Sequence, residues 1–208
     1  MPTEMMASWG TLVMLGAFHG INPGMGWLFA VALGMQERRR GAVWRALVPL
    51  GAGHALAIAV AVGVALALGL VIPLASLRWP IAAVLVSLGV LRFYRHRHPR
   101  WTGMRVSMGG LTVWSFLMAT AHGAGLMLWP ALMAICYPAG AEPGDAGALA
   151  PAALGIGVHT LAMLAVTGAV AVGVYEWIGL GILRRAWFNL DLVWTIALVA
   201  AGALLLLG

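Results

Sequence analysis

Charged side chains are scarce in this sequence. Only 9% of its 208 residues are charged, and lysine is absent, so all twelve basic residues are arginines. Soluble domains carry about 25% charged residues. A chain with so little charge cannot cover a globular surface with solvated groups, which excludes an ordinary soluble domain. Instead, 62% of the residues are apolar and spans of roughly 20 apolar residues recur, which predicts a membrane protein.

Cysteine and acidic residues are also rare. The single cysteine, Cys136, excludes a disulfide framework and a thiolate metal site, and its apolar surroundings predict a small buried side chain. The six acidic residues include none near the middle of a predicted span. The first eight residues carry no basic side chain, so we expect no cleaved signal peptide.

The net charge of +6 reflects orientation in a membrane rather than nucleic-acid binding. The arginines lie in short loops between apolar spans, and we therefore expect no nucleic-acid partner. We predict an all-α, polytopic membrane bundle forming a single domain over residues 1–208, with the lipid bilayer as its partner. Its six predicted spans are 9–35, 46–77, 79–94, 106–137, 152–178 and 186–207.

The arginines alternate between the two sides of this bundle. Eleven fall in or beside loops 36–45, 95–105 and 179–185, whereas Arg78 alone falls on the opposite side. Because arginine-rich loops stay in the cytoplasm, these loops are predicted to lie inside. Both termini are then predicted outside, in a multi-pass protein of a bacterial-type inner membrane.

An internal repeat relates the two halves of the chain. Histidine–glycine pairs occur at mid-span at His19 and His122, and a histidine preceded by two glycines occurs at His54 and again at His159. The offsets are 103 and 105 residues. The halves, about 9–94 and 106–207, each contain three predicted spans, so the second must enter the membrane from the opposite side. This predicts a 3+3 inverted repeat, as in many secondary transporters.

These four membrane histidines are the candidate binding residues. An imidazole inside a membrane is costly and is by default a functional candidate, although each histidine could instead bond a neighbouring helix and only hold the bundle together. Asn22 and Met25 follow His19 at helical spacing and are predicted further contacts. A helix break at Pro23 and Gly24 would free backbone carbonyls as additional ligands, and Pro130 marks a second predicted break. The spacing of Gly16, Gly20 and Gly24 indicates close helix packing.

The segment HGINPGM, residues 19–25, resembles the first-helix signature of the nickel/cobalt transporters, the NicO-type branch of the lysine-exporter-like superfamily. His19, Pro23 and Gly24 match that signature, and the segments around His54 and His159 resemble a second one. The resemblance implies a transporter of metal cations. Asn22 and Met25 depart from it, because the family has a carboxylate and a second histidine at these positions. Thioether and imidazole ligands favour softer ions such as Cu(I).

The sequence therefore predicts a small transporter that moves a metal cation, of the copper, nickel or cobalt class, or another small solute. The alternative is a membrane b-type cytochrome in which the same histidines bind haem. We expect no enzymatic function, because no Ser-His-Asp set is present. A homo-oligomer or a subunit role in a membrane complex stays open.

Overall fold

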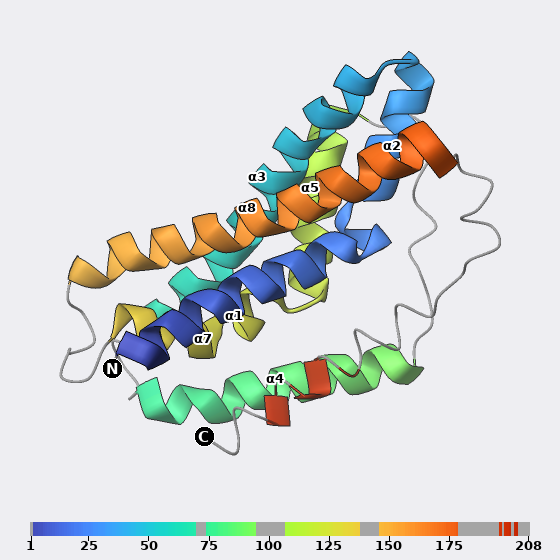
Figure 1. Ribbon diagram of the computed structural model, residues 1–208. Helices are drawn as coiled ribbons and strands as arrows, with labels where there is room; N and C mark the ends of the chain where they lie inside the picture. Colours follow the sequence, from blue (N-terminus) through green and yellow to red (C-terminus); the bar gives the residue numbers. More distant parts are fainter. Residues whose placement is uncertain are drawn as a thin grey trace.

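The computed structural model describes residues 2–69, 74–94, 107–137 and 146–178 together with 196, 198–200, 202 and 203, and this part of the chain consists of helices joined by short turns, with no strand. The all-α prediction is therefore confirmed. The loops 95–105 and 179–185 lie outside the described residues, and so does most of the sixth predicted span. The elements, drawn in Figure 1, are α1 (Pro2–Ile21), η1 (Pro23–Met25), α2 (Trp27–Glu37), α3 (Arg40–Gly69), α4 (Leu74–Tyr94), α5 (Met108–Ala121), α6 (Ala124–Met127), α7 (Trp129–Cys136), η2 (Ala146–Ala148), α8 (Leu149–Gly173) and η3 (Val174–Ile178), the last a π-helical turn.

Two of the described helices are long and apolar enough to cross a membrane. They are Arg40–Leu68 and Leu149–Trp177, and three shorter apolar helices accompany them. Their exposed side chains are large and apolar: on α3 these are Val48, Leu56, Val60, Val64 and Leu68, and on α8 Leu149, Leu154 and Leu161. Extended apolar surface of this kind marks contact with lipid or protein. Two such helices indicate membrane association, whereas the count of six spans stays a prediction.

The first predicted span is broken in its middle. Helix α1 ends at Ile21, the 3-10 turn η1 begins with Pro23, and α2 starts at Trp27. Proline at the first position of a turn loses no hydrogen bond, since that N–H would be unpaired anyway. Gly26 closes the turn with φ 122°, a conformation that side-chain-bearing residues avoid. The break at Pro23 and Gly24 is therefore confirmed.

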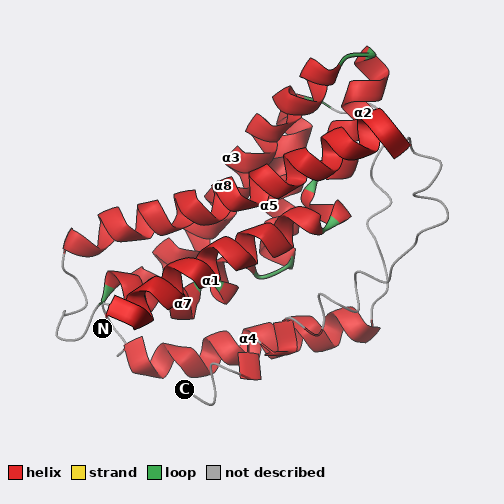
Figure 2. Cartoon of the chain, viewed as in Figure 1, coloured by secondary structure: helices red, strands yellow, loops and turns green. Residues whose placement is uncertain are grey.

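The fourth predicted span is broken twice. Helix α5 ends at Ala121, Gly123 adopts φ 66°, and α7 begins only at Trp129, next to Pro130. The prediction from Pro130 thus holds for the second break, while the first, marked by the left-handed Gly123, comes earlier in the span. Figure 2 shows these interruptions as short loops between helices. The second predicted span is described as helix α3 up to Gly69, and its last residues, 74–77, belong to α4.

The bundle is organised around two helix pairs, α1 with α8 and α3 with α5. Helices α1 and α8 lie side by side along much of their length (Figure 1). Gly16 and Gly20 face α8 so closely that a Cβ at either position would collide with a carbonyl oxygen, that of His159 or Met163. The small-residue pattern therefore does place two helix backbones in contact at Gly16 and Gly20, as predicted.

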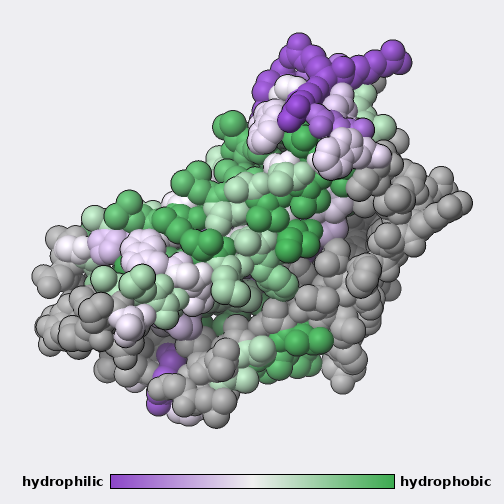
Figure 3. Space-filling model, viewed as in Figure 1, coloured by the Kyte–Doolittle hydropathy of each residue, from purple (hydrophilic) through white to green (hydrophobic). Residues whose placement is uncertain are grey.

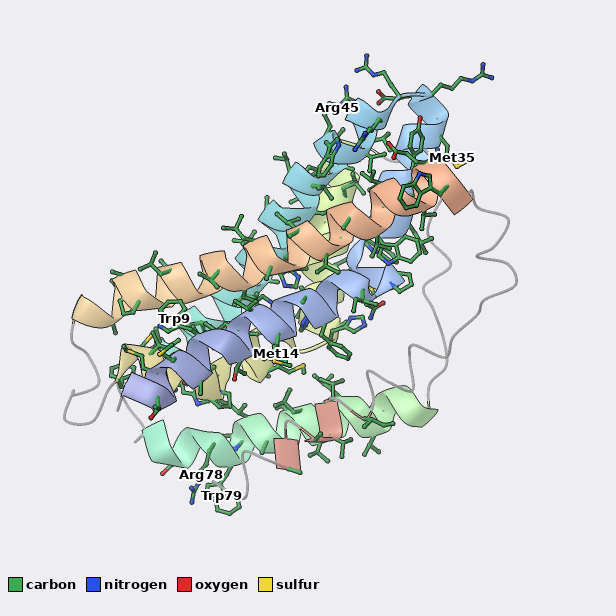
Figure 4. All side chains as sticks on the ribbon, viewed as in Figure 1. Trp9, Met14, Met35, Arg45, Arg78 and Trp79 are labelled. Atoms are coloured by element: carbon green, nitrogen blue, oxygen red, sulfur yellow. The ribbon has the colours of Figure 1, made fainter. Side chains whose placement is uncertain are left out.

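Charged groups gather at one end of the bundle. There Arg40 pairs with Glu176 at 3.0 Å, and Glu37 pairs with Arg45 at 2.6 Å and with Arg39 at 3.4 Å. Figure 3 shows this hydrophilic end above a mostly hydrophobic body. Arg45 lies at this end and Trp9 toward the other in Figure 4. The long helices therefore have charged groups at one end and apolar surface along their middle.

Candidate functional site

All four predicted histidines are buried, with exposed fractions of 0% for His19, His54 and His159 and 1% for His122. His54 and His159 lie in the middle of the continuous helices α3 and α8. His19 lies in the last turn of α1, and His122 caps the C-terminal end of α5. Each half of the chain therefore contributes one histidine from an unbroken helix and one from a helix that ends at it.

Three of the imidazoles form a central cluster, which we define as His19, His54 and His159. The ring of His19 lies 5.5 Å from that of His54 and 5.1 Å from that of His159, edge-on to both. The rings of His54 and His159 lie 5.4 Å apart with an angle of 12° between their planes. The cluster draws on three helices, α1, α3 and α8.

His54 and His159 meet end to end. Their Nε2 atoms are 3.2 Å apart. A ring nitrogen lies roughly 1.1 Å from its ring centre, so rings pointing directly at each other should have centres roughly 5.5 Å apart. The observed 5.4 Å and the 12° angle therefore describe two nearly coplanar rings in line, joined by an N–H···N hydrogen bond.

Backbone carbonyls fix the outer nitrogens of three histidines. Nδ1 of His19 lies 2.7 Å from the carbonyl oxygen of Leu15, and Nδ1 of His122 lies 2.7 Å from that of Met118. Nδ1 of His159 lies 3.1 Å from the carbonyl oxygen of Leu12, on the neighbouring helix α1. A carbonyl oxygen only accepts, so each of these Nδ1 atoms carries the proton and donates. In each of these three rings Nδ1 is therefore the donor to a backbone carbonyl, and Nε2 is the nitrogen that can face other side chains.

Asn22 joins the two helix breaks. Its Oδ1 accepts a hydrogen bond of 2.8 Å from the backbone N–H of Gly24, which fixes the orientation of the amide. The amide nitrogen Nδ2 then faces Nε2 of His122 at 3.5 Å. Because Nδ2 only donates, Nε2 of His122 is the acceptor, in agreement with the proton on its Nδ1. Asn22 is 6% exposed, so this contact lies inside the protein.

Met25 packs in an apolar cluster next to the first break. It is fully buried and belongs to a cluster with Ala65, Leu85, Met127 and Trp129. Gly24, the last of the predicted packing glycines, approaches side chains, Met118 and Asn22, rather than a helix backbone. Pro23 and Gly24 thus shape the break that positions Asn22.

The carbonyls around the first break are already bonded, contrary to the prediction that the break would free them. The indole N–H of Trp27 donates to the carbonyl oxygen of Ile21 at 2.9 Å, and that of Trp114 donates to Gly24 at 3.0 Å. The hydroxyl of Thr167 lies 3.4 Å from the carbonyl oxygen of Gly20. Trp27, Trp114 and Thr167 were not among the residues predicted to form the site. The sequence did contain a sign of the two tryptophans. Membrane tryptophans usually lie at the ends of spans, whereas Trp27 and Trp114 lie inside theirs.

No group of three or more histidine, cysteine or acidic side chains among the described residues is arranged as a metal site. The geometry of His54 and His159 gives the physical reason, because their Nε2 atoms point at each other instead of at a common centre. Comparison with models of known protein families, with characterised proteins and with solved structures finds no match. The likeness to nickel/cobalt transporters therefore rests on the short motifs alone.

Proposed function

We propose that this chain is a small membrane transporter that carries a small cation or another small solute past its buried histidines. The observation that carries this proposal is the ending of α1 and of α5 at buried histidines, His19 and His122. Broken helices near the bilayer midplane are a common way for transporters to build a binding site. Because the carbonyls at the first break already accept hydrogen bonds, the proposal rests on the imidazole side chains of His19 and His122.

We further propose that the two halves are related as a 3+3 inverted repeat of six spans. The contacts of the helices support this relation. The first helix of each half packs on the second helix of the other half, α1 on α8 and α5 on α3. A two-fold relation would exchange these pairs with each other. In both halves the first helix is interrupted at its histidine–glycine pair: α1 ends one residue after His19 and Gly20, and α5 ends just before His122 and Gly123.

Membrane placement follows from the surface. The apolar exposed side chains of α3 and α8 suit lipid, and the ion pairs of Glu37 and Glu176 lie at one end of these helices. By the positive-inside rule this arginine-rich end faces the cytoplasm. Inside such a bundle protein groups take the place of water as hydrogen-bond partners, as the carbonyl oxygens of Met118 and Leu12 do for Nδ1 of His122 and of His159.

The cargo is proposed from chemistry and from the motif. The resemblance of residues 19–25 to nickel/cobalt transporters makes a metal cation the first cargo to test. An alkali cation is less suited, because the carbonyls of Ile21 and Gly24 already accept indole N–H groups. Haem between His54 and His159 is not proposed. A haem iron between two imidazoles needs their nitrogens about 4 Å apart, from metal–nitrogen bonds of about 2 Å, whereas the Nε2 atoms of these two residues are 3.2 Å apart.

Reconstitution into liposomes tests this proposal. Purified protein is placed in vesicles, and entry of Ni²⁺, Co²⁺, Zn²⁺ and Cu⁺ is followed by elemental analysis of the washed lumen. We expect one or more of these ions to enter faster than in protein-free vesicles, and His19→Ala or His122→Ala to abolish that flux while the protein still inserts. His96→Ala, in the predicted cytoplasmic loop, is the control and should keep the flux. Flux no faster than in empty vesicles for every ion would overturn the cation proposal.

A further inference from the structure

We propose that His54 and His159 share one proton and together form a proton-transfer element that links the two halves of the protein. This inference goes beyond the transport of a cargo, because it assigns the coupling ion and the two residues that carry it. The nearly coplanar, end-to-end rings with Nε2 atoms 3.2 Å apart are the observation on which it rests.

The hydrogen-bond donors and acceptors define where the shared proton sits. Nδ1 of His159 must carry a proton, because it faces the carbonyl oxygen of Leu12. In neutral His159 the other nitrogen, Nε2, is then an acceptor. Neutral His54 therefore donates from Nε2, which leaves a lone pair on its own Nδ1. That Nδ1 is buried and has no hydrogen-bond partner among the described residues.

This arrangement leaves a lone pair on Nδ1 of His54 at which a second proton can bind. A buried polar atom without a partner is uncommon and costly, so it requires an explanation. A proton delivered from water to Nδ1 of His54 turns this ring into an imidazolium. The shared proton then moves to His159: the N–H bond at Nε2 of His54 breaks and an N–H bond at Nε2 of His159 forms.

The charge has now moved from α3 to α8 without movement of either ring. His159 is left with protons on both nitrogens, and its Nδ1 proton leaves to water on the side of Leu12 to restore neutrality. One proton enters and one leaves, so atoms and charge balance. Each ring is left in its other tautomer, and it must turn or exchange its proton before the next cycle. Histidine chains serve as proton relays in membrane pumps and transporters for this reason.

The groups that face His54 limit the cluster to one extra proton at a time. His19 from α1 lies edge-on at 5.5 Å, and His159 from α8 is its hydrogen-bond partner. His122, which follows α5, is the fourth buried imidazole of the site. All of these groups are imidazoles, and among the described residues no carboxylate is in this set. Like charges this close disfavour each other, so a second cation in the cluster is excluded by repulsion.

Nuclear magnetic resonance detects the shared proton directly. In protein labelled with ¹⁵N-histidine and held in nanodiscs, we expect one imidazole proton shifted strongly downfield and coupled to the nitrogens of two rings. The signal should vanish in both His54→Gln and His159→Gln and persist in His96→Gln. Glutamine is chosen because its amide fills the site and still bonds, but takes up no proton. Absence of the coupled signal from the wild type would overturn the inference.

Proton movement is then measured in vesicles that contain a pH-sensitive dye, under a potassium diffusion potential, with and without the cation panel used above. We expect lumenal acidification by the wild type in at least one condition, reduced to the rate of protein-free vesicles by His54→Gln and by His159→Gln. No acidification by the wild type, or acidification that both variants retain, would assign the pair a purely structural role. Proton flux without any cation flux would support the pair and contradict the proposed cargo, so the two proposals fail separately.

Discussion

Adding one methyl group at Gly16 should push α1 away from α8 at the level of the histidines. A Cβ there would collide with the carbonyl oxygen of His159 and lie 2.9 Å from the Cβ of Ala162. Such overpacking costs roughly 1–3 kcal/mol, partly offset by a gain of up to about 1 kcal/mol because alanine favours helix over glycine. We therefore expect Gly16→Ala to lower the free energy of unfolding by up to roughly 2 kcal/mol.

Gly10→Ala is the matched control for this experiment. Gly10 lies on the same helix and is exposed, and a Cβ there would meet nothing within 4 Å. Only the gain in helix propensity applies, so the two variants should differ by roughly 1–3 kcal/mol, or by a few degrees in the midpoint of thermal unfolding in detergent. The hydrogen bond from His159 to Leu12 crosses the same interface and should weaken in Gly16→Ala alone. Equal midpoints for the two variants would refute the close approach of α1 and α8.

Three further predictions follow from the topology and the breaks. Reporter fusions at Arg40 and Gly144 should report opposite sides of the membrane because of the arginine distribution, and the same side for both would break the inverted repeat. Trp114→Phe should lower the free energy of unfolding by about 1–3 kcal/mol, since it removes the donor to the Gly24 carbonyl. Trp79→Phe, at a side chain 55% exposed, should lower it far less, and equal losses of thermal stability would contradict this prediction. Asn22→Asp replaces the Nδ2 donor that faces His122 by a carboxylate oxygen, so Nε2 of His122 should change from acceptor to donor. An unchanged ¹⁵N shift there would refute the assigned orientation of Asn22.

Much of the site's location was predictable from local sequence. Proline followed by glycine disfavours a continuous helix at Pro23 and Gly24. His19, His54, His122 and His159 have to be buried if their spans are. The glycine spacing indicated a close helix contact, which the structure places at Gly16 and Gly20 against α8. Each of these features depends on residues close by in the sequence or on burial alone, so it can be predicted from a single sequence.

The bonding of the site was not predictable, because it depends on positions of one helix relative to another. The contact of Trp114 with Gly24 joins residues 90 positions apart, and a break with free carbonyls would have the same sequence. The His54–His159 bond likewise depends on how far α3 is shifted along α8, and a shift of about 1.5 Å per residue would separate the two Nε2 atoms. Periodicity identifies which residues are buried but gives no such offset.

The two kinds of histidine differ in what a movement of the halves would cost them. His19 and His122 bond the carbonyl four residues earlier in their own helices, so these bonds persist when a helix moves as a rigid body. The bond between His54 and His159 joins α3 of the first half to α8 of the second, and it exists only while these helices stay in register. Any rocking of one half against the other must therefore break this bond and leave two buried ring nitrogens without partners. Protonation of one ring and entry of water would each lower that cost, which ties the movement of the halves to the proton that His54 and His159 share.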